Sequence, residues 1–170
     1  MPHKGVPLKM LVFVWWLFHN RLTTKDNLIH LGIIHNDSQL CVNGCDDPEM
    51  ASNLFLDCCC FGSIWYLVRK WLGISGVDHA DITNHFIQFS NIVGRSKARR
   101  SIMQLISFSC TWEIWKERNN KIFNNNECST IQLLEKIKAR SFWWMKANHT
   151  TISFSHHNWW LSPLLCLGIE

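Results

Sequence analysis

The sequence has a single tyrosine, four prolines and eight glycines among 170 residues, and only 18% of its residues are charged. So little glycine and proline excludes a collagen-like or low-complexity chain. Hydrophobic residues make up 47% of the chain, which excludes an intrinsically disordered protein. A chain of this length can fill one sizeable hydrophobic core but not two. We therefore expect one folded domain.

No apolar run is long enough to cross a membrane, which takes about 20 residues. The run at residues 10–18 follows Lys4 and Lys9 in the manner of a signal peptide, but it continues into a polar segment without a small-residue cleavage pattern. We therefore predict no membrane segment and no secretion. The expected location is intracellular, nuclear or cytoplasmic.

Common catalytic motifs are also missing. There is no Gly-x-Ser-x-Gly elbow, no glycine-rich phosphate loop and no His-Glu-x-x-His pair. Glu113 and Glu117 stand four residues apart, a spacing better explained by a solvent-exposed helix face than by an acid–base pair. Their expected partners are Lys116, Arg118 and Lys121. The sequence therefore predicts a protein that is not an enzyme.

Hydrophobic periodicity predicts helices along most of the chain. The expected helices cover residues 8–18, 25–31, 61–72, 96–123 and 129–147, with a less regular one within 75–94. Ser129 and Gln132 match a capping box, and an irregular tail docked by its tryptophans is expected beyond residue 148. No run alternates in the manner of a strand. The fold class is therefore all-α, with a small cysteine-bearing, zinc-knuckle-like loop.

Five of the eight cysteines lie within a span of twenty residues. They are Cys41, Cys45, Cys58, Cys59 and Cys60. Without a secretory signal, this spacing is more typical of thiols or metal ligands than of a disulfide framework. A Cys-x3-Cys turn can present two thiolates from one side, and Cys58 offers a third. A metal site and a set of reduced thiols are both compatible with the pattern.

The order of motifs along the chain resembles a known family. The run VWWLFHNRLTTKDNL at residues 14–28 is followed by Gly32-Ile33, by Cys41-x3-Cys45, by NLFLDC at residues 53–58 and by Ile64-Trp65. This order resembles the reverse-transcriptase zinc-binding domain of plant LINE-type (non-LTR) retrotransposons. Residues 112–123 and 141–147 are similar to the region that follows it. The resemblance implies a zinc-binding-type domain over residues 1–75 and a helical C-terminal extension over 76–170, packed together as one compact unit.

The resemblance implies a zinc ion held by two loop cysteines, a histidine and a cysteine five residues further on. Carried over by position, these ligands fall on Cys41, Cys45, Asn53 and Cys58. The histidine is therefore replaced by Asn53, whose amide oxygen is a poor zinc ligand beside thiolate or imidazole. The fourth donor would have to be a substitute. The candidates are His35, Cys59, Cys60 and a water molecule.

The resemblance also implies a role beside a polymerase. The polymerase motif Tyr-x-Asp-Asp is absent, because Tyr66 is followed by Leu67, Val68 and Arg69. The family resemblance implies binding to RNA or DNA, and the formal charge of +4 is compatible with such binding. The candidate contact residues are Arg95, Lys97, Arg99 and Arg100, with Arg21 and Lys25 near the zinc loop. A separate polymerase domain is the other expected partner.

Two alternatives to a nucleic-acid-binding domain remain open. One is a degenerate retroelement fragment with no selected activity, which the Asn53 substitution favours. The other is a protein-interaction module, which exposed tryptophans would favour, because doublets such as Trp15-Trp16 cannot both point inward.

Overall fold

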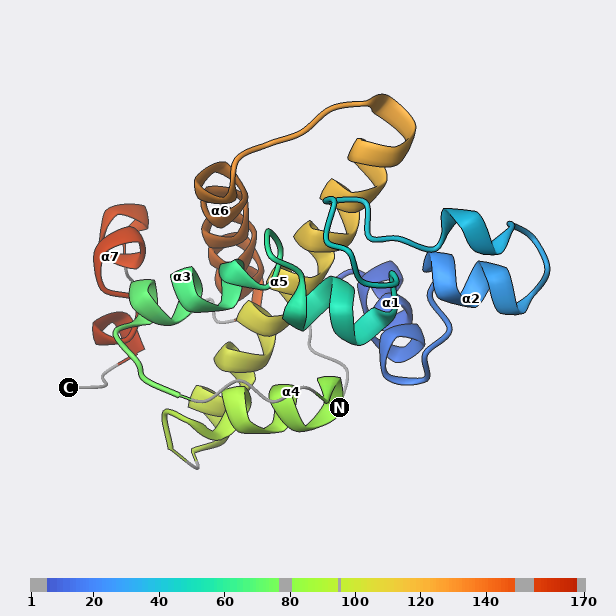
Figure 1. The fold of residues 1–170 in the computed structure, drawn as a ribbon. Helices are drawn as coiled ribbons and strands as arrows, with labels where there is room; N and C mark the ends of the chain where they lie inside the picture. The colour runs from blue at the N-terminus through green and yellow to red at the C-terminus, as the bar shows by residue number, and fades with distance from the viewer. Residues whose placement is uncertain (1–5, 77–80, 95, 149–154, 168–170) are drawn as a thin grey trace.

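The computed structural model describes residues 6–76, 81–94, 96–148 and 155–167 (Figure 1). Within these residues the only β-type pairing is an isolated antiparallel bridge between Leu40 and Pro48, so the all-α prediction is confirmed. The α-helices are α1 (Leu8–Phe18), α2 (Lys25–His30), α3 (Ser63–Leu72), α4 (Ile82–Asn91), α5 (Lys97–Asn124), α6 (Thr130–Asn148) and α7 (His156–Leu161). Short turns are η1 (Asn36–Ser38), η2 (Asn53–Asp57), which is a π-helix, and η3 (Leu165–Leu167). None of the described helices is long and apolar enough to cross a membrane.

Helix α5 is the centre of the fold. It runs through the middle of the molecule, and α1, α4 and α6 pack against it, while α3 and α7 pack against α6 (Figure 1). Twelve of its 28 residues are buried, including Met103, Leu105 and Ile114. Phe13 of α1 meets Trp112 of α5 edge to face, with ring centroids 5.3 Å apart. The N-terminal helix thus shares one core with the C-terminal half of the chain.

The ends of the shorter helices follow the sequence signals. The side chain of Thr24 accepts a hydrogen bond from the backbone N–H of Asn27, and Gly32 takes the left-handed conformation (φ +68°) just after α2. Ser129 and Gln132 form the expected capping box, with N–H to side-chain oxygen distances of 2.9 and 3.2 Å. These local signals fixed the helix boundaries because they act within one turn of chain.

The prediction of an irregular tail was wrong in part. Residues 149–154 lie outside the described part of the chain, but α7 forms beyond them, capped by the side chain of Ser155. Six residues are too short to show a helical period in the sequence. Docking by tryptophan is confirmed, because Trp159 is fully buried and its indole N–H donates to the carbonyl of Lys138 at 3.1 Å.

The prediction that Glu113 and Glu117 lie on a solvent-exposed face of α5 was also wrong. Glu113 and Glu117 are buried, with exposed fractions of 2% and 5%. Helix α6 covers them and supplies counter-ions: the Arg140 guanidinium pairs with Glu113, and Lys136 Nζ lies 3.3 Å from Glu117 Oε2. Of the expected partners, Lys116 does pair with Glu113, at 3.9 Å. Spacing within one helix cannot reveal that a second helix packs over the same face.

Candidate metal centre

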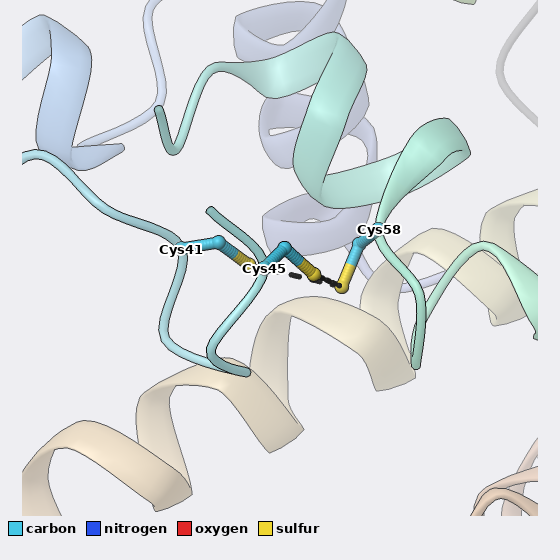
Figure 2. A group of neighbouring side chains, drawn as sticks. All are labelled: Cys41, Cys45 and Cys58. Atoms are coloured by element: carbon cyan, nitrogen blue, oxygen red, sulfur yellow. Dashed lines mark hydrogen bonds between the residues drawn. The ribbon is translucent and has the colours of Figure 1, made fainter. Parts of the chain in front are cut away.

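Three cysteine thiols converge at one point (Figure 2). Cys41 and Cys45 come from the loop between η1 and η2, and Cys58 directly follows η2. The sulfur of Cys58 lies 3.7 Å from that of Cys41 and 3.5 Å from that of Cys45. All three sulfurs are within 4.8 Å of one another, and no other group of three or more metal-ligating side chains in the described residues meets this limit.

The loop that carries Cys41 and Cys45 is folded back by its own backbone. The N–H of Cys41 donates to the carbonyl of Asp47 at 3.0 Å, and the N–H of Gly44 donates to the carbonyl of Cys41 at 3.1 Å. Gly44 has φ +75°, a conformation that a residue with a side chain rarely adopts. The turn therefore brings both thiols to the same side of the loop.

Cys58 is positioned by the π-turn before it and the tight turn after it. Its N–H donates to the carbonyl of Asn53 at 2.7 Å, and its carbonyl accepts from the N–H of Gly62 at 2.7 Å. A Cβ atom on Gly62 would lie 2.3 Å from the carbonyl oxygen of Leu56, so only glycine fits there. The indole N–H of Trp65 holds η2 against α3 by donating to the Phe55 carbonyl at 2.7 Å.

The three thiols fit a zinc ion. Zinc binds thiolate sulfur at about 2.3 Å, and tetrahedral geometry then separates the sulfurs by about 3.8 Å. The two sulfur separations at Cys58, 3.7 and 3.5 Å, are close to this value. Cys41, Cys45 and Cys58 would thus hold three corners of the tetrahedron, and the ion would tie the loop to η2.

The hydrogen bonds in the site favour a thiolate at Cys58. The bond from the Cys41 thiol lowers the pKa of Cys58 to about 4, aided by the N–H of Phe61 and by Asn43. Asn43 Nδ2 lies 3.1 Å from the Cys58 sulfur. Burial raises the pKa of Cys45 to about 11, and the bond that Cys41 shares with Cys58 raises the pKa of Cys41. Cys58 is therefore the thiol that ionises most readily, and zinc would displace the protons of the other two thiols.

A chain of polar contacts connects the thiols to α5. Asn43 donates to Cys58 through Nδ2 and accepts from Lys121 Nζ through Oδ1 at 3.1 Å. Lys121 in turn pairs with Glu127 at 3.0 Å. The cation thus orients the amide that contacts the sulfur, an outer-shell role common around metal ligands. The sequence contains no sign of this contact, because 78 residues separate Asn43 from Lys121.

The position of the implied histidine is occupied by a buried amide. Asn53 is 8% exposed, and its Oδ1 finds no hydrogen-bond partner in the described residues. Of the substitutes, Cys59 lies closest to the cluster, with its sulfur 2.9 Å from that of Cys45, whereas Cys60 contacts the sulfur of Cys59 at 3.8 Å. His35 is exposed at the start of η1. Asn53, Cys59, Cys60 and His35 therefore all lie outside the compact group of three thiols.

The predicted basic contact residues lie in two places. Lys97, Arg99 and Arg100 occupy the first turn of α5, capped by the side chain of Ser96. Arg100 lines a groove of about 370 Å³ together with the aromatic rings of Phe18, Phe86 and Phe108. Arg95 lies outside the described residues.

Arg21 and Lys25 sit between α1 and the cysteine loop. The Arg21 guanidinium lies over the exposed ring of Trp15, 5.1 Å from its centroid. Lys25 Nζ donates to the carbonyl of Leu40 at 2.7 Å, next to Cys41. Lys25 therefore braces the loop, and Arg21 keeps a cationic, aromatic surface beside it.

Residues 1–65 match the sequence model of a protein family described as zinc-binding in reverse transcriptase. The matched segment contains the three clustered cysteines and Asn53, and it ends within α3. Comparison of the chain with curated proteins and with solved structures finds no match. The resemblance to a reverse-transcriptase zinc-binding domain is confirmed for residues 1–65, and its plant LINE-type origin stays a prediction.

Proposed function

We propose that the protein is a noncatalytic zinc-binding domain, derived from a retrotransposon reverse transcriptase of the plant LINE type, that binds RNA or DNA. The observation that carries the proposal is the convergence of Cys41, Cys45 and Cys58 inside a segment that matches a zinc-binding family. Its place of action would be intracellular, in the nucleus or the cytoplasm. A noncatalytic role agrees with the surroundings of Glu113 and Glu117, which are buried and paired with the partly exposed cations Arg140 and Lys136.

Zinc would act as a structural cross-link between the loop and η2. The purified, reduced protein is expected to hold one zinc per chain, measured by elemental analysis after dialysis. Cobalt in the same site should give the charge-transfer absorption of thiolate ligands. Cys58→Ser should lose the metal because it removes the thiol that both other sulfurs contact. Cys166→Ser, far along the chain from the cluster, should retain the metal. If Cys58→Ser retains its zinc as Cys166→Ser does, the site is rejected.

The start of α5 supports contact with nucleic acid. Lys97 is exposed and carries no acidic neighbour in the first turn of the helix. Arg100 stands at a groove lined by Phe18, Phe86 and Phe108, and such a combination of cations with aromatic rings suits a single strand of RNA or DNA. Cations would neutralise phosphates while rings contact bases.

Fluorescence anisotropy with labelled single-stranded RNA and DNA tests this contact. Lys97→Ala/Arg100→Ala should weaken binding and reduce the slope of log affinity against log salt by about 1.4, since each phosphate contact on a single strand contributes about 0.7. Lys70→Ala removes an exposed lysine of α3 and serves as the matched control. Binding that does not respond to salt would reject a phosphate-based grip.

A second candidate function is docking to a polymerase domain. It is favoured by the outer face of α1, where Leu8 is 75%, Trp15 47% and Trp16 46% exposed. A helix with apolar residues on both faces is normally covered on both. Trp15→Ser/Trp16→Ser should abolish capture of a purified reverse-transcriptase polymerase domain, and should leave zinc content unchanged. Equal capture by the variant would exclude this face as the docking surface.

A further inference from the structure

Cys59 differs in exposure from the three cysteines of the cluster. It is exposed, whereas Cys41 and Cys58 are buried and Cys45 is half-buried. Its sulfur lies 2.9 Å from that of Cys45, the shortest sulfur–sulfur separation among the described cysteines. A disulfide bond is about 2.05 Å long, so these two sulfurs need to approach by less than about 1 Å.

The backbone holds the pair in this arrangement. The N–H of Cys59 donates to the sulfur of Cys45 at 3.3 Å, so the turn after Cys58 is fastened to the loop through Cys45. Cys59 nevertheless lies outside the group of three sulfurs that could share one metal ion. Its position suits a reaction with Cys45 better than a place in the same coordination shell.

We propose that Cys45 and Cys59 form an oxidation-sensitive thiol pair whose disulfide removes Cys45 from the metal site. Disulfide formation itself follows from the geometry alone, whereas its effect on zinc rests on the proposed zinc-binding function. The sulfur of Cys45 cannot serve as a thiolate ligand and as half of a disulfide at once. The cluster would keep only Cys41 and Cys58 as thiolate donors, and the ion would be released.

The oxidant we invoke is a peroxide, and the step balances with hydrogen peroxide. The exposed Cys59 sulfur attacks one peroxide oxygen; an S–O bond forms, the O–O bond breaks, and the first water leaves with the thiol proton. The Cys45 sulfur then attacks the Cys59 sulfur; the S–S bond forms, the S–O bond breaks, and the second water leaves with the Cys45 proton. Two thiols are oxidised by two electrons, and one peroxide is reduced to two waters.

The experiment counts thiols in the full-length protein, first without metal. After treatment with hydrogen peroxide and denaturation, the natural protein should lose two of its eight free thiols, and a thiol reductant should restore them. Cys59→Ser should lose none. Cys45→Ser keeps the attacking thiol but lacks its partner, so it should form no disulfide and lose at most the Cys59 thiol, as a sulfenic acid. Cys60→Ser is the matched control, because this thiol is adjacent in sequence but its sulfur contact among the described cysteines is with Cys59, and the variant should lose two. Tandem mass spectrometry of the oxidised peptide should place the bond between residues 45 and 59.

The same variants separate this inference from the zinc site. Reduced Cys59→Ser should hold as much zinc as the natural protein, and peroxide should release zinc from the natural protein and from Cys60→Ser but not from Cys59→Ser. Absence of thiol loss in the natural protein, or thiol loss that persists in Cys59→Ser, would overturn the pair. Reduced Cys59→Ser that binds less zinc would also overturn it, because Cys59 would then be a ligand. A disulfide that forms in a protein unable to bind zinc would support the Cys45–Cys59 thiol pair and reject the proposed zinc-binding function.

Discussion

Arg118 of α5 and Glu49 of the cysteine loop form an ion pair that is buried on both sides. Arg118 Nη2 lies 2.6 Å from Glu49 Oε1, and the two side chains are 4% and 0% exposed. The same carboxylate oxygen accepts from Arg118 Nε and from the backbone N–H of Lys25. One buried acid therefore fastens the loop, the start of α2 and the central helix together.

Removal of the arginine should destabilise the fold strongly. Arg118→Met leaves the Glu49 carboxylate buried without its counter-ion, a change that costs about 3–5 kcal/mol in comparable pairs. Urea unfolding followed by tryptophan fluorescence would measure the loss. In Arg118→Met/Glu49→Leu both charges are gone, and much of the stability should return. A loss below about 1 kcal/mol in the single variant would contradict the view that this pair holds the loop.

Loss of the amide beside Cys58 should weaken zinc binding without removing a ligand. Asn43→Ala deletes the donor to the Cys58 sulfur and the acceptor for Lys121, and outer-shell changes of this kind cost about 10–100-fold in metal affinity. Competition with a chromogenic chelator would measure the change. Asn36→Ala, an exposed residue of η1, should behave as the natural protein does. Equal affinities in both variants would show that the Asn43 contact does not tune the metal.

The sequence predicted the helices well because their signals are local. The capping box at Ser129 and Gln132 acts within a few residues, and it is observed. The three cysteines could likewise be grouped by spacing and family resemblance. The fold class and the thiol cluster therefore followed from short-range patterns.

What the sequence could not predict depends on contacts between distant segments. Glu113 and Glu117 have the spacing of a solvent face, yet α6 covers them with Arg140 and Lys136. The Asn43–Lys121 contact and the Glu49–Arg118 pair join residues 78 and 69 positions apart. Side chains of these types occur throughout the chain, so nothing in their local sequence marks them as partners.

Stability should depend on pH through Glu117. Burial opposes ionisation, but hydrogen bonds from Cys128 and from Lys136 outweigh it and lower the pKa of Glu117 below its ordinary value. In the unfolded protein a glutamate has a pKa of about 4.3. Because the pKa of Glu117 is lower in the folded protein, its ionised carboxylate stabilises the fold above that pH, and this stabilisation is lost as the pH falls through the pKa of the folded protein.

Glu117→Gln should therefore cost about 1–3 kcal/mol at pH 7 and progressively less below pH of about 4. Urea unfolding at pH 7 and at a pH below about 4 would measure the loss of stability under each condition. Asp37→Asn, which alters an exposed carboxyl group, should change stability little at either pH. A Glu117→Gln penalty that is the same at both pH values would show that the ionised carboxylate is not what the fold needs.

Asn53 offers the sharpest test of how the site departs from its family. Among the described residues its buried side-chain oxygen has no hydrogen-bond partner, and it stands in the position where the family resemblance implies a histidine. An imidazole nitrogen is a good zinc donor and an amide oxygen a poor one. Asn53→His should therefore bind zinc at least about tenfold more tightly, a gain of about 1.4 kcal/mol for each factor of ten.

Chelator competition would measure this gain, with Asn36→His as the control, since it adds the same ring to an exposed turn. A tighter site only in Asn53→His would mean that the three thiolates and the buried position still form a four-ligand architecture. The natural protein would then hold zinc with an open fourth position. Equal affinity in both histidine variants would mean that the ring does not reach the sulfurs, and that the π-turn at Asn53 no longer has the geometry a fourth ligand requires.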